Sequence, residues 1–286
     1  MSAMLVMFSP SGQDKLRPGL LSGGHVLDLS GRYGSIAAFL ADHPQGWDPT
    51  GGAGEDMASW ARDAVRLGPP IDPGSLVYAV GANYRQHAEE AGLAVPAQPV
   101  IFTKPYTALV GAGEPIRLPP LSSQMDYEGE MAVIIGRNAT QVSRADAPSY
   151  VAGVTILNDT TARDLQWVEL GKHRIVDWFA SKCLDGTSPL GPGIASMQGI
   201  ADVHQLPLRT TLNGAVMQDA NTGLMVYDTW QLIEFISARA TLRAGDIIAT
   251  GTPFGVGGFR NIFLRSGDVV RIELGGVGAL ENPVLR

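Results

Sequence analysis

Most hydrophobic positions of the chain follow the period of two that is typical of β-strands, in short runs separated by turn residues. The clearest turn is Asn213-Gly214, which favours a tight hairpin between the runs on its two sides. Strands therefore dominate the predicted structure. The expected strands cover residues 4–8, 19–21, 25–29, 76–80, 100–103, 128–135, 151–157, 208–212, 215–218, 246–249 and 269–274.

Helical spacing of hydrophobic residues is rarer in this chain. It is clearest over residues 229–239, which carry an apolar face and follow a candidate N-cap, Asp228. A second helix is expected between Asn83, as its cap, and Gly92, as the residue that ends it. Two N-terminal helices are predicted at residues 35–41 and 55–66.

Segments rich in Pro and Gly divide the chain. One, at residues 49–54, lies between the two N-terminal helices, and another, at residues 67–74, is the best candidate linker. The linker predicts a small N-terminal α/β domain, residues 1–70, followed by a larger domain, residues 71–286. Since strands are many, helices few and repeats of 20–50 residues absent, we expect a β-rich α+β fold.

Composition excludes several classes of protein. The 286 residues carry a formal net charge of −7, which does not suit binding to nucleic acid. No stretch reaches the ~18 consecutive apolar residues of a membrane helix, and the N-terminus lacks the pattern of a signal peptide. The single cysteine, Cys183, indicates a reducing compartment. We therefore expect a soluble cytoplasmic protein.

Charged residues interrupt the hydrophobic pattern most sharply in the run that begins at Asp126. On a strand, Asp126, Glu128 and Glu130 share a face, and the residues that follow are apolar on both faces, as in a strand covered on both sides. Buried carboxylates that cannot neutralise one another favour a divalent cation with oxygen ligands. The alternative is an edge strand whose glutamates face water.

A third candidate ligand, Asp159, comes directly after the apolar run 151–157, in a position where active-site residues tend to gather. With Glu128 and Glu130 it would suit Mg²⁺ or Mn²⁺ with positions left open for a chelating substrate. Asp159 could instead cap a following helix.

Several other residues have both a chemical and a structural interpretation. His87 and Glu90, at i and i+3, could be a general base with its orienting carboxylate, or a surface ion pair. Lys182 falls in a turn-rich segment, where most lysines are solvated. The loop at residues 250–258 offers hydroxyls and backbone N–H groups suited to a carboxylate, but it lacks the ending of a phosphate loop.

Two further features favour structural roles. His173 and Asp177, at i and i+4, lack other candidate metal ligands nearby and are expected at the surface. Cys183 has no histidine in local register and is expected as a small buried apolar residue rather than a nucleophile.

Four blocks, residues 125–136, 156–166, 182–192 and 250–257, follow the His87 helix in an order that resembles the fumarylacetoacetate hydrolase family. The resemblance covers roughly residues 75–286. It implies a mixed β-roll of layered sheets, a variable N-terminal domain and a homodimer.

The resemblance also implies roles for individual residues. It makes metal ligands of Glu128, Glu130 and Asp159, catalytic groups of His87, Glu90 and Lys182, and substrate contacts of Arg163, Gln166 and Thr252. The chain departs from the family pattern at Cys183-Leu184 and at Gly193, so the resemblance does not define the floor of the pocket.

Members of this family act on 2-oxo acids. We expect a hydrolase that uses Mg²⁺ or Mn²⁺ to cleave a carbon–carbon bond of a 2,4-dioxo acid, such as an acylpyruvate. In that reaction His87, oriented by Glu90, would activate water and Lys182 would stabilise the oxyanion. The alternatives are oxaloacetate decarboxylation, isomerisation of a 2-hydroxyhepta-2,4-diene-1,7-dioate, or a metal-binding module without turnover.

Overall fold

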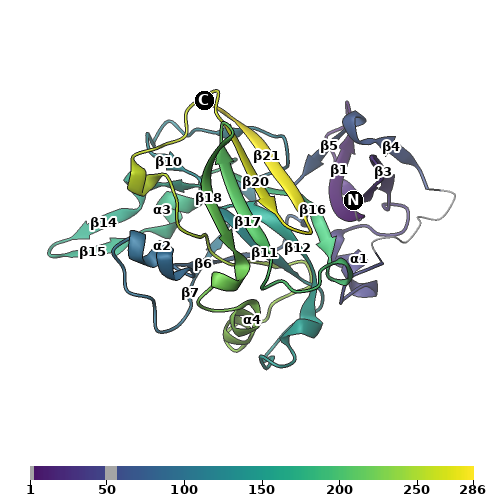
Figure 1. The fold of residues 1–286 in the computed structure, drawn as a ribbon. Helices are drawn as coiled ribbons and strands as arrows, with labels where there is room; N and C mark the ends of the chain where they lie inside the picture. Colours follow the sequence, from purple (N-terminus) through teal and green to yellow (C-terminus); the bar gives the residue numbers. More distant parts are fainter. Residues whose placement is uncertain (1–2, 49–56) are drawn as a thin grey trace.

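The computed structural model describes residues 3–48 and 57–286, and its largest element is a twelve-stranded sheet (Figure 1). Ten strands follow the order β4-β3-β2-β1-β16-β12-β11-β19-β6-β7, while β5 pairs with β1 and β8 pairs with β16. The strands are β1 (Met4–Pro10), β2 (Arg17–Ser22), β3 (His25–Asp28), β4 (Ser59–Ala61), β5 (Val65–Gly68), β6 (Val77–Gly81), β7 (Val100–Lys104), β8 (Leu109–Val110), β11 (Gly129–Ile135), β12 (Val151–Asn158), β16 (Ser188–Ser196) and β19 (Ile247–Ala249).

A second sheet of five strands crosses in front of the first in Figure 1, in the order β18-β17-β20-β21-β9. Two further pairs, β10 with β13 and β14 with β15, form separate ribbons. These strands are β9 (Ile116–Arg117), β10 (Met125–Asp126), β13 (Thr161–Ala162), β14 (Trp167–Leu170), β15 (His173–Val176), β17 (Pro207–Leu212), β18 (Ala215–Asn221), β20 (Val269–Leu274) and β21 (Gly278–Leu285).

Helices among the described residues are short. The α-helices are α1 (Ile36–Asp42), α2 (Arg85–Glu90), α3 (Trp178–Lys182) and α4 (Thr229–Ser237). The 3₁₀ turns are η1 (Arg62–Ala64), η2 (Tyr106–Ala108), η3 (Ala147–Tyr150), η4 (Arg163–Leu165), η5 (Met197–Gly199), η6 (Thr222–Leu224) and η7 (Gly258–Arg260). No helix in the described part of the chain has the length and apolar character needed to cross a membrane. The predicted β-rich α+β fold is confirmed.

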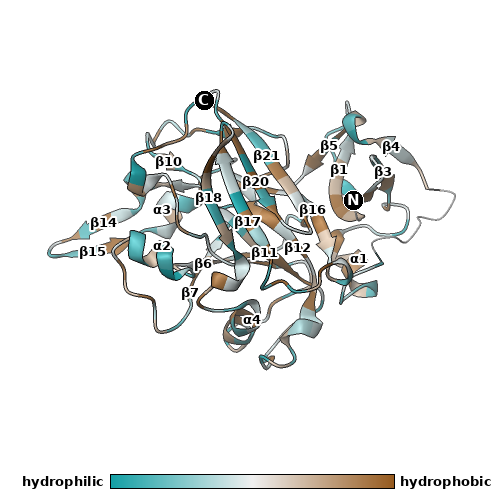
Figure 2. Ribbon diagram, viewed as in Figure 1, coloured by the Kyte–Doolittle hydropathy of each residue, from teal (hydrophilic) through white to brown (hydrophobic). Residues whose placement is uncertain are grey.

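Strand β11 is the centre of the hydrophobic core. Its odd residues, such as Met131 and Val133, pack in one cluster with the second sheet and α4, whereas Ala132 and Ile134 pack in another with α1. The predicted alternation of faces is therefore confirmed. In Figure 2, hydrophobic residues mark the central strands, whereas the short helix α2 is hydrophilic.

Most of the predicted strands are present, but the helix predicted at residues 55–66 is wrong. Residues 55 and 56, like the Pro- and Gly-rich stretch 49–54, lie outside the described part, and the remainder forms β4, η1 and β5. Buried Val65 and Leu67 alternate with exposed Arg66, and β5 pairs with β1. The period of two in this segment, supported by tertiary pairing, outweighs its helical propensity.

The candidate linker at residues 67–74 is packed rather than extended through solvent. It starts within β5, and Ile71 is fully buried. Strand β1 pairs with both β5 and β16, so the N-terminal strands continue the main sheet. The division into domains at residue 70 stays a prediction.

The ends of the helices agree with the sequence in part. Asp228 caps α4 in a capping box, and Gly92, with φ +66°, follows the end of α2. Asn83, however, is not the cap of α2, because that position belongs to Tyr84. The Asn83 amide instead donates to the carbonyls of Tyr227 and Thr250 at 3.0 and 2.7 Å, which anchors the start of α2 to the core.

Candidate active site

Three carboxylates, which we call the acidic triad, meet at one end of the central strands: Glu128, Glu130 and Asp159. Glu128 and Glu130 flank Gly129 at the start of β11, Asp159 follows β12, and the two strands pair there through Gly129 and Asn158. Each residue of the triad is at most 4% exposed, and one oxygen from each lies within 4.8 Å of the others. The edge-strand alternative is wrong, because β11 has a neighbour on each side.

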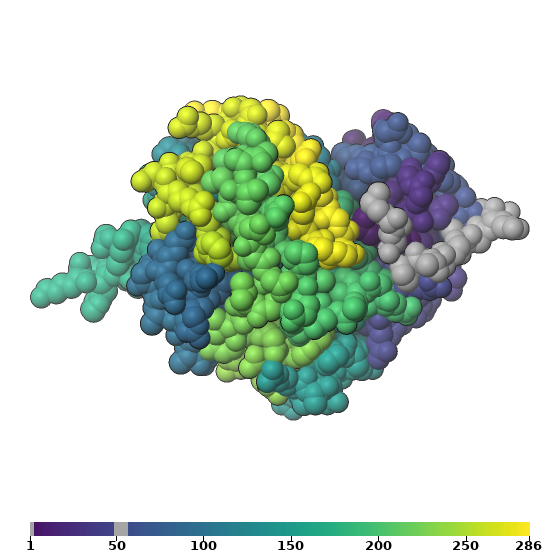
Figure 3. Space-filling model, viewed as in Figure 1, coloured from purple at the N-terminus to yellow at the C-terminus, as the bar shows by residue number. Residues whose placement is uncertain are grey.

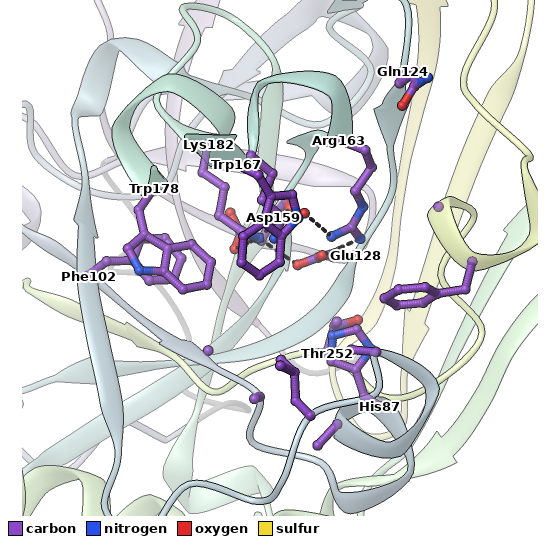
Figure 4. A pocket seen from close by; sticks show the side chains of 18 of the residues that line it. His87, Phe102, Gln124, Glu128, Asp159, Arg163, Trp167, Trp178, Lys182 and Thr252 are labelled. Carbon is purple, nitrogen blue, oxygen red and sulfur yellow. Dashed lines mark hydrogen bonds and ion pairs between the residues drawn. The ribbon is translucent and has the colours of Figure 1, made fainter. Parts of the chain in front are cut away.

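Two lysines approach the acidic triad from α3 and β7. Lys182 Nζ lies 2.7 Å from Glu128 Oε2 and 2.6 Å from Asp159 Oδ2 (Figure 4). Lys104 Nζ lies 2.7 Å from the other oxygen of Asp159, Oδ1. The alternative role of Asp159 as a helix cap is wrong, since its side chain binds these lysines and Asp177 caps α3.

Burial and charge shift the pKa values of this cluster in opposite directions. Burial raises the pKa of Glu128, but Lys182 and Arg163 outweigh burial and lower it to about 2. Burial and the nearby Asp159 raise the pKa of Glu130 well above its usual range. Burial lowers the pKa of Lys182, but Asp159 and Glu128 outweigh burial and raise it, so its ammonium remains charged and donates hydrogen bonds.

The acidic triad fits a hard divalent cation. Carboxylate oxygens are the ligands that Mg²⁺ and Mn²⁺ prefer. Each carboxylate is buried, and Asp159 Oδ1 faces Lys104 Nζ at 2.7 Å as an ion pair. Buried carboxylates are tolerated when they are paired or coordinate a metal. Glu128, Glu130 and Asp159 could therefore hold the cation.

Arg163 is fixed at the edge of the acidic triad by Asp126. Its Nη2 lies 2.6 Å from Glu128 Oε1, and its Nε lies 2.8 Å from Asp126 Oδ2. Asp126 is fully buried and also accepts from the N–H of Gly258 at 2.7 Å. A Cβ on Gly258 would lie 2.9 Å from Arg163 Nε, so this close approach needs glycine. Asp126 thus positions Arg163 instead of joining the triad.

Backbone N–H groups of the loop at residues 250–258 are occupied by carboxylates of the protein itself. Gly251 donates to Glu130 Oε2 at 2.9 Å, and Gly255 donates to Glu90 Oε2 at 3.0 Å. The expectation that carboxylates suit this loop is correct in its chemistry. The N–H groups of Gly251 and Gly255 are, however, engaged within the chain.

Arg163, Gln166 and Thr252, the predicted substrate contacts, all line the cavity. Arg163 Nη1 reaches Gln166 Oε1 at 3.3 Å, which holds the two side chains together. The Thr252 hydroxyl donates to the Gly129 carbonyl at 3.0 Å and accepts from Gln218 at 2.8 Å, so its hydrogen-bonding capacity is largely used inside the protein.

His87 and Glu90 lie on α2, and His87 lines the cavity across from Glu128 and Asp159 (Figure 4). His87 Nδ1 is buried and lies 3.7 Å from Glu90 Oε2, and no group among the described residues forms a hydrogen bond with it. Burial raises the pKa of Glu90, but the contacts with His87 and the Gly255 N–H outweigh burial and lower it. His87 therefore faces the cavity with an ionised carboxylate beside its imidazole, an arrangement suited to proton transfer.

The cavity between these groups has a volume of about 270 Å³. One wall is aromatic, since Phe102 and Trp178 stack with ring centroids 4.6 Å apart. Trp167 and Arg174 extend the wall from the β14–β15 hairpin, which projects from the body of the molecule in Figure 3. The cavity therefore has charged residues at one end and an apolar wall along one side.

The structure adds Lys104 and Asp126 to the site. Asp126 was expected only to share a strand face with Glu128 and Glu130 and proves to position Arg163, whereas Lys104 was not predicted at all. Alternation along β7 is the signal that could have found it, because Lys104 shares a buried face with Phe102.

Lys182 does not lie in a loop, as the turn-rich sequence predicted, but ends α3 at 3% exposure. His173 is exposed on β15, and Asp177 caps α3, as their expected structural roles require. Burial raises the pKa of the half-buried Cys183, which does not favour a thiolate nucleophile.

Comparison with known proteins gives a consistent family. Residues 76–285 match the model of the fumarylacetoacetate (FAA) hydrolase C-terminal domain. A mitochondrial oxaloacetate tautomerase of Bos taurus is 41% identical over 92% of this chain and 85% of its own length. The solved structure of 2-hydroxyhepta-2,4-diene-1,7-dioate isomerase from Mycobacterium marinum is 36% identical, with a TM-score of 0.76 over 100% of this chain and 99% of its own.

A fumarylacetoacetate hydrolase from psychrophilic Exiguobacterium antarcticum is 34% identical, with a TM-score of 0.83 over 99% of both chains. The family model covers most of the chain, and the relatives align along nearly all of it. The resemblance drawn from four short sequence blocks is therefore confirmed, and the chain shares the fold of these enzymes. The chain belongs to the fumarylacetoacetate hydrolase family.

Proposed function

We propose that the protein is a divalent-cation-dependent isomerase that interconverts the enol and keto forms of a 2-oxo dicarboxylic acid. Oxaloacetate and a 2-hydroxyhepta-2,4-diene-1,7-dioate are the leading substrates. The names of two relatives, the tautomerase of Bos taurus and the isomerase of Mycobacterium marinum, support isomerisation more than the hydrolysis expected from the sequence.

The observation that carries this proposal is the placement of a buried acidic triad across a cavity from an imidazole. A bound Mg²⁺ or Mn²⁺ would chelate the carboxylate and 2-oxo group of the substrate and make the adjacent carbon more acidic. His87 would remove a proton from that carbon and return it at the enol oxygen, so the reaction needs no other reactant. Glu90 would orient the imidazole.

Lys182 supplies a charged hydrogen-bond donor beside the acidic triad, and such a donor stabilises an enolate oxygen. Arg163 and Gln166 face the same cavity and would orient the substrate carboxylate. Both roles use groups whose positions are fixed before substrate arrives, which lowers the cost of reaching the transition state.

Hydrolytic carbon–carbon cleavage is the second candidate. The solved relative from Exiguobacterium antarcticum is named a fumarylacetoacetate hydrolase. The same His87 could activate a water molecule against the distal carbonyl of an acylpyruvate. The two reactions differ in that isomerisation returns the proton to the substrate, whereas hydrolysis consumes water.

A panel of reactions separates these candidates. Purified protein is assayed with enol-oxaloacetate, a 2-hydroxydienedioate and an acylpyruvate, each with Mn²⁺ and after chelation. We expect metal-dependent isomerisation to have the highest kcat/KM. A higher kcat/KM for acylpyruvate cleavage would establish the hydrolase, and an absence of metal-dependent turnover throughout would reject the proposed function.

Three broader expectations accompany this proposal. We propose a homodimer and a cytoplasmic location, which size measurement in solution and cell fractionation would test. We also retain the proposed boundary at residue 70, before the region matched by the family model at residues 76–285.

A further inference from the structure

Lys104 is a buried cation whose role the proposed reaction leaves unassigned. It ends β7 with a fully buried side chain, and its Nζ lies 2.7 Å from Asp159 Oδ1. The same Nζ donates to the backbone carbonyl of Lys182. Lys182 lines the cavity, whereas Lys104 is not among the described residues that do so. Lys104 therefore acts on the site from behind Asp159.

The formal charges around the acidic triad show what Lys104 changes. The triad and Asp126 supply four carboxylates, while Arg163, Lys182 and Lys104 supply three cations in direct contact with them. With all four carboxylates ionised, as cation binding requires, these groups leave one negative charge, and a divalent cation would turn it into one positive charge. Without Lys104, the cation-loaded cluster would be neutral.

We infer that Lys104 is a buried counter-charge that makes the cation-loaded site positive and so attracts the anionic substrate without touching it. Charges in a poorly solvated interior act over several ångströms, so an ammonium behind Asp159 affects the cavity. Lys104 is thus a positioning residue for charge. This inference rests on the cation site of the proposed function, but not on which 2-oxo acid reacts.

Lys104 should also weaken the binding of the cation itself. Its ammonium repels a cation held on Asp159, because its Nζ lies only 2.7 Å from Asp159 Oδ1. Asp159 keeps its contact with Lys182 through Oδ2 at 2.6 Å. We therefore expect the loss of this repulsion to exceed any loss of side-chain order when Lys104 loses its charge.

Lys104→Met tests the inference, because methionine keeps most of the apolar stem and removes the charge. We expect Mn²⁺ to bind about tenfold tighter or more, as measured by calorimetry. We also expect KM for the 2-oxo acid to rise by a larger factor than kcat falls. The matched control is Lys172→Met at the exposed turn between β14 and β15, which should leave Mn²⁺ affinity, KM and kcat unchanged.

Unchanged or weaker Mn²⁺ binding by Lys104→Met would overturn the inference, since a purely structural lysine has no reason to oppose the cation. Failure of the wild type to bind Mn²⁺ would reject the proposed function instead, so the two failures are distinguishable. If Lys104→Met does not fold without metal, the double variant with Asp159→Asn is tested. A folded double variant supports the counter-charge, and an unfolded one rejects it.

Discussion

The two sides of the cavity are built in different ways. The acidic triad stands on the central strands β11 and β12, with each member at most 4% exposed and fixed by ion pairs or backbone N–H groups. His87 and Glu90 stand on a helix of six residues, their side chains are 12% and 20% exposed, and their nearest atoms are 3.7 Å apart.

This difference separates two requirements of the proposed chemistry. Groups that stabilise developing charge work best when they are fixed in advance, and a sheet buried on both faces supplies that rigidity. A proton-transferring residue has to follow the substrate, and catalytic contacts often tighten only when substrate is bound. The 3.7 Å gap between His87 and Glu90 leaves room for such tightening, while Asn83 and the Gly255 N–H hold the two ends of α2.

The largest effect on metal binding and turnover is expected from a substitution in the acidic triad. Asp159→Asn keeps the side-chain shape but removes a ligand charge, so Mn²⁺ binding should be lost. Turnover should fall by more than about 10²-fold, which is the upper end of the loss expected when a residue that supports a metal ligand is removed. Asp164→Asn is the control, because Asp164 binds Ser122 and Ser123 outside the triad. Normal Mn²⁺ stoichiometry in Asp159→Asn would remove this residue from the ligand set.

Substitutions of His87 and Glu90 should affect turnover without affecting metal affinity. His87→Ala is expected to lower kcat by roughly 10²–10⁴-fold, the usual contribution of a general base. Mn²⁺ affinity should stay within a few-fold of wild type, because His87 lies across the cavity from the acidic triad. Glu90→Gln should have a smaller effect of the same kind. Activity of His87→Ala close to that of wild type would place the base elsewhere.

Removal of the metal should lower thermal stability only in proteins whose acidic triad is intact. A cation that binds only the native state adds about 2.7 kcal/mol at a hundredfold excess over its Kd. For a chain of this size that corresponds to a rise in Tm of roughly 5–10 °C. Calorimetry before and after chelation should show the shift in wild type and in His87→Ala, but not in Asp159→Asn. Equal shifts in all three proteins would place the cation outside the triad.

Acidification should weaken metal binding through Glu130. Its raised pKa means that the carboxyl holds a proton below that pKa, and the cation must displace the proton to bind. Mn²⁺ affinity should therefore fall by about tenfold per pH unit below the pKa of Glu130 and level off above it. Glu128, with a pKa of about 2, remains ionised throughout. A Kd independent of pH would contradict this coupling.

The central strand and its chemistry could be predicted from the sequence because local alternation determines both. The faces of β11 and the convergence of Glu128 and Glu130 follow from a period of two that the fold preserves. The hairpin turn at Asn213-Gly214 also depends only on local conformation, with φ of +53° and +82°.

Other features depend on partners far along the chain. Strand β16 contains Pro189 and Pro192, which argue against a central strand, yet it lies between β1 and β12. Lys104 acquires its role from Asp159, 55 residues later, and the N–H groups of the 250–258 loop acquire theirs from Glu130 and Glu90. Sequence periodicity contains no information about such contacts.

The pairing of β1 with β16 makes the N-terminal segment a cover for one edge of β16. Truncation before β6 would leave Ile194 and Ala195 of β16 without the backbone partners that Leu5 and Met4 now supply. Such an unpaired edge is a template for intermolecular association. The shortened chain would therefore lose solubility through self-association even if its chemistry were intact, and any replacement for this segment would have to supply a strand or another shield.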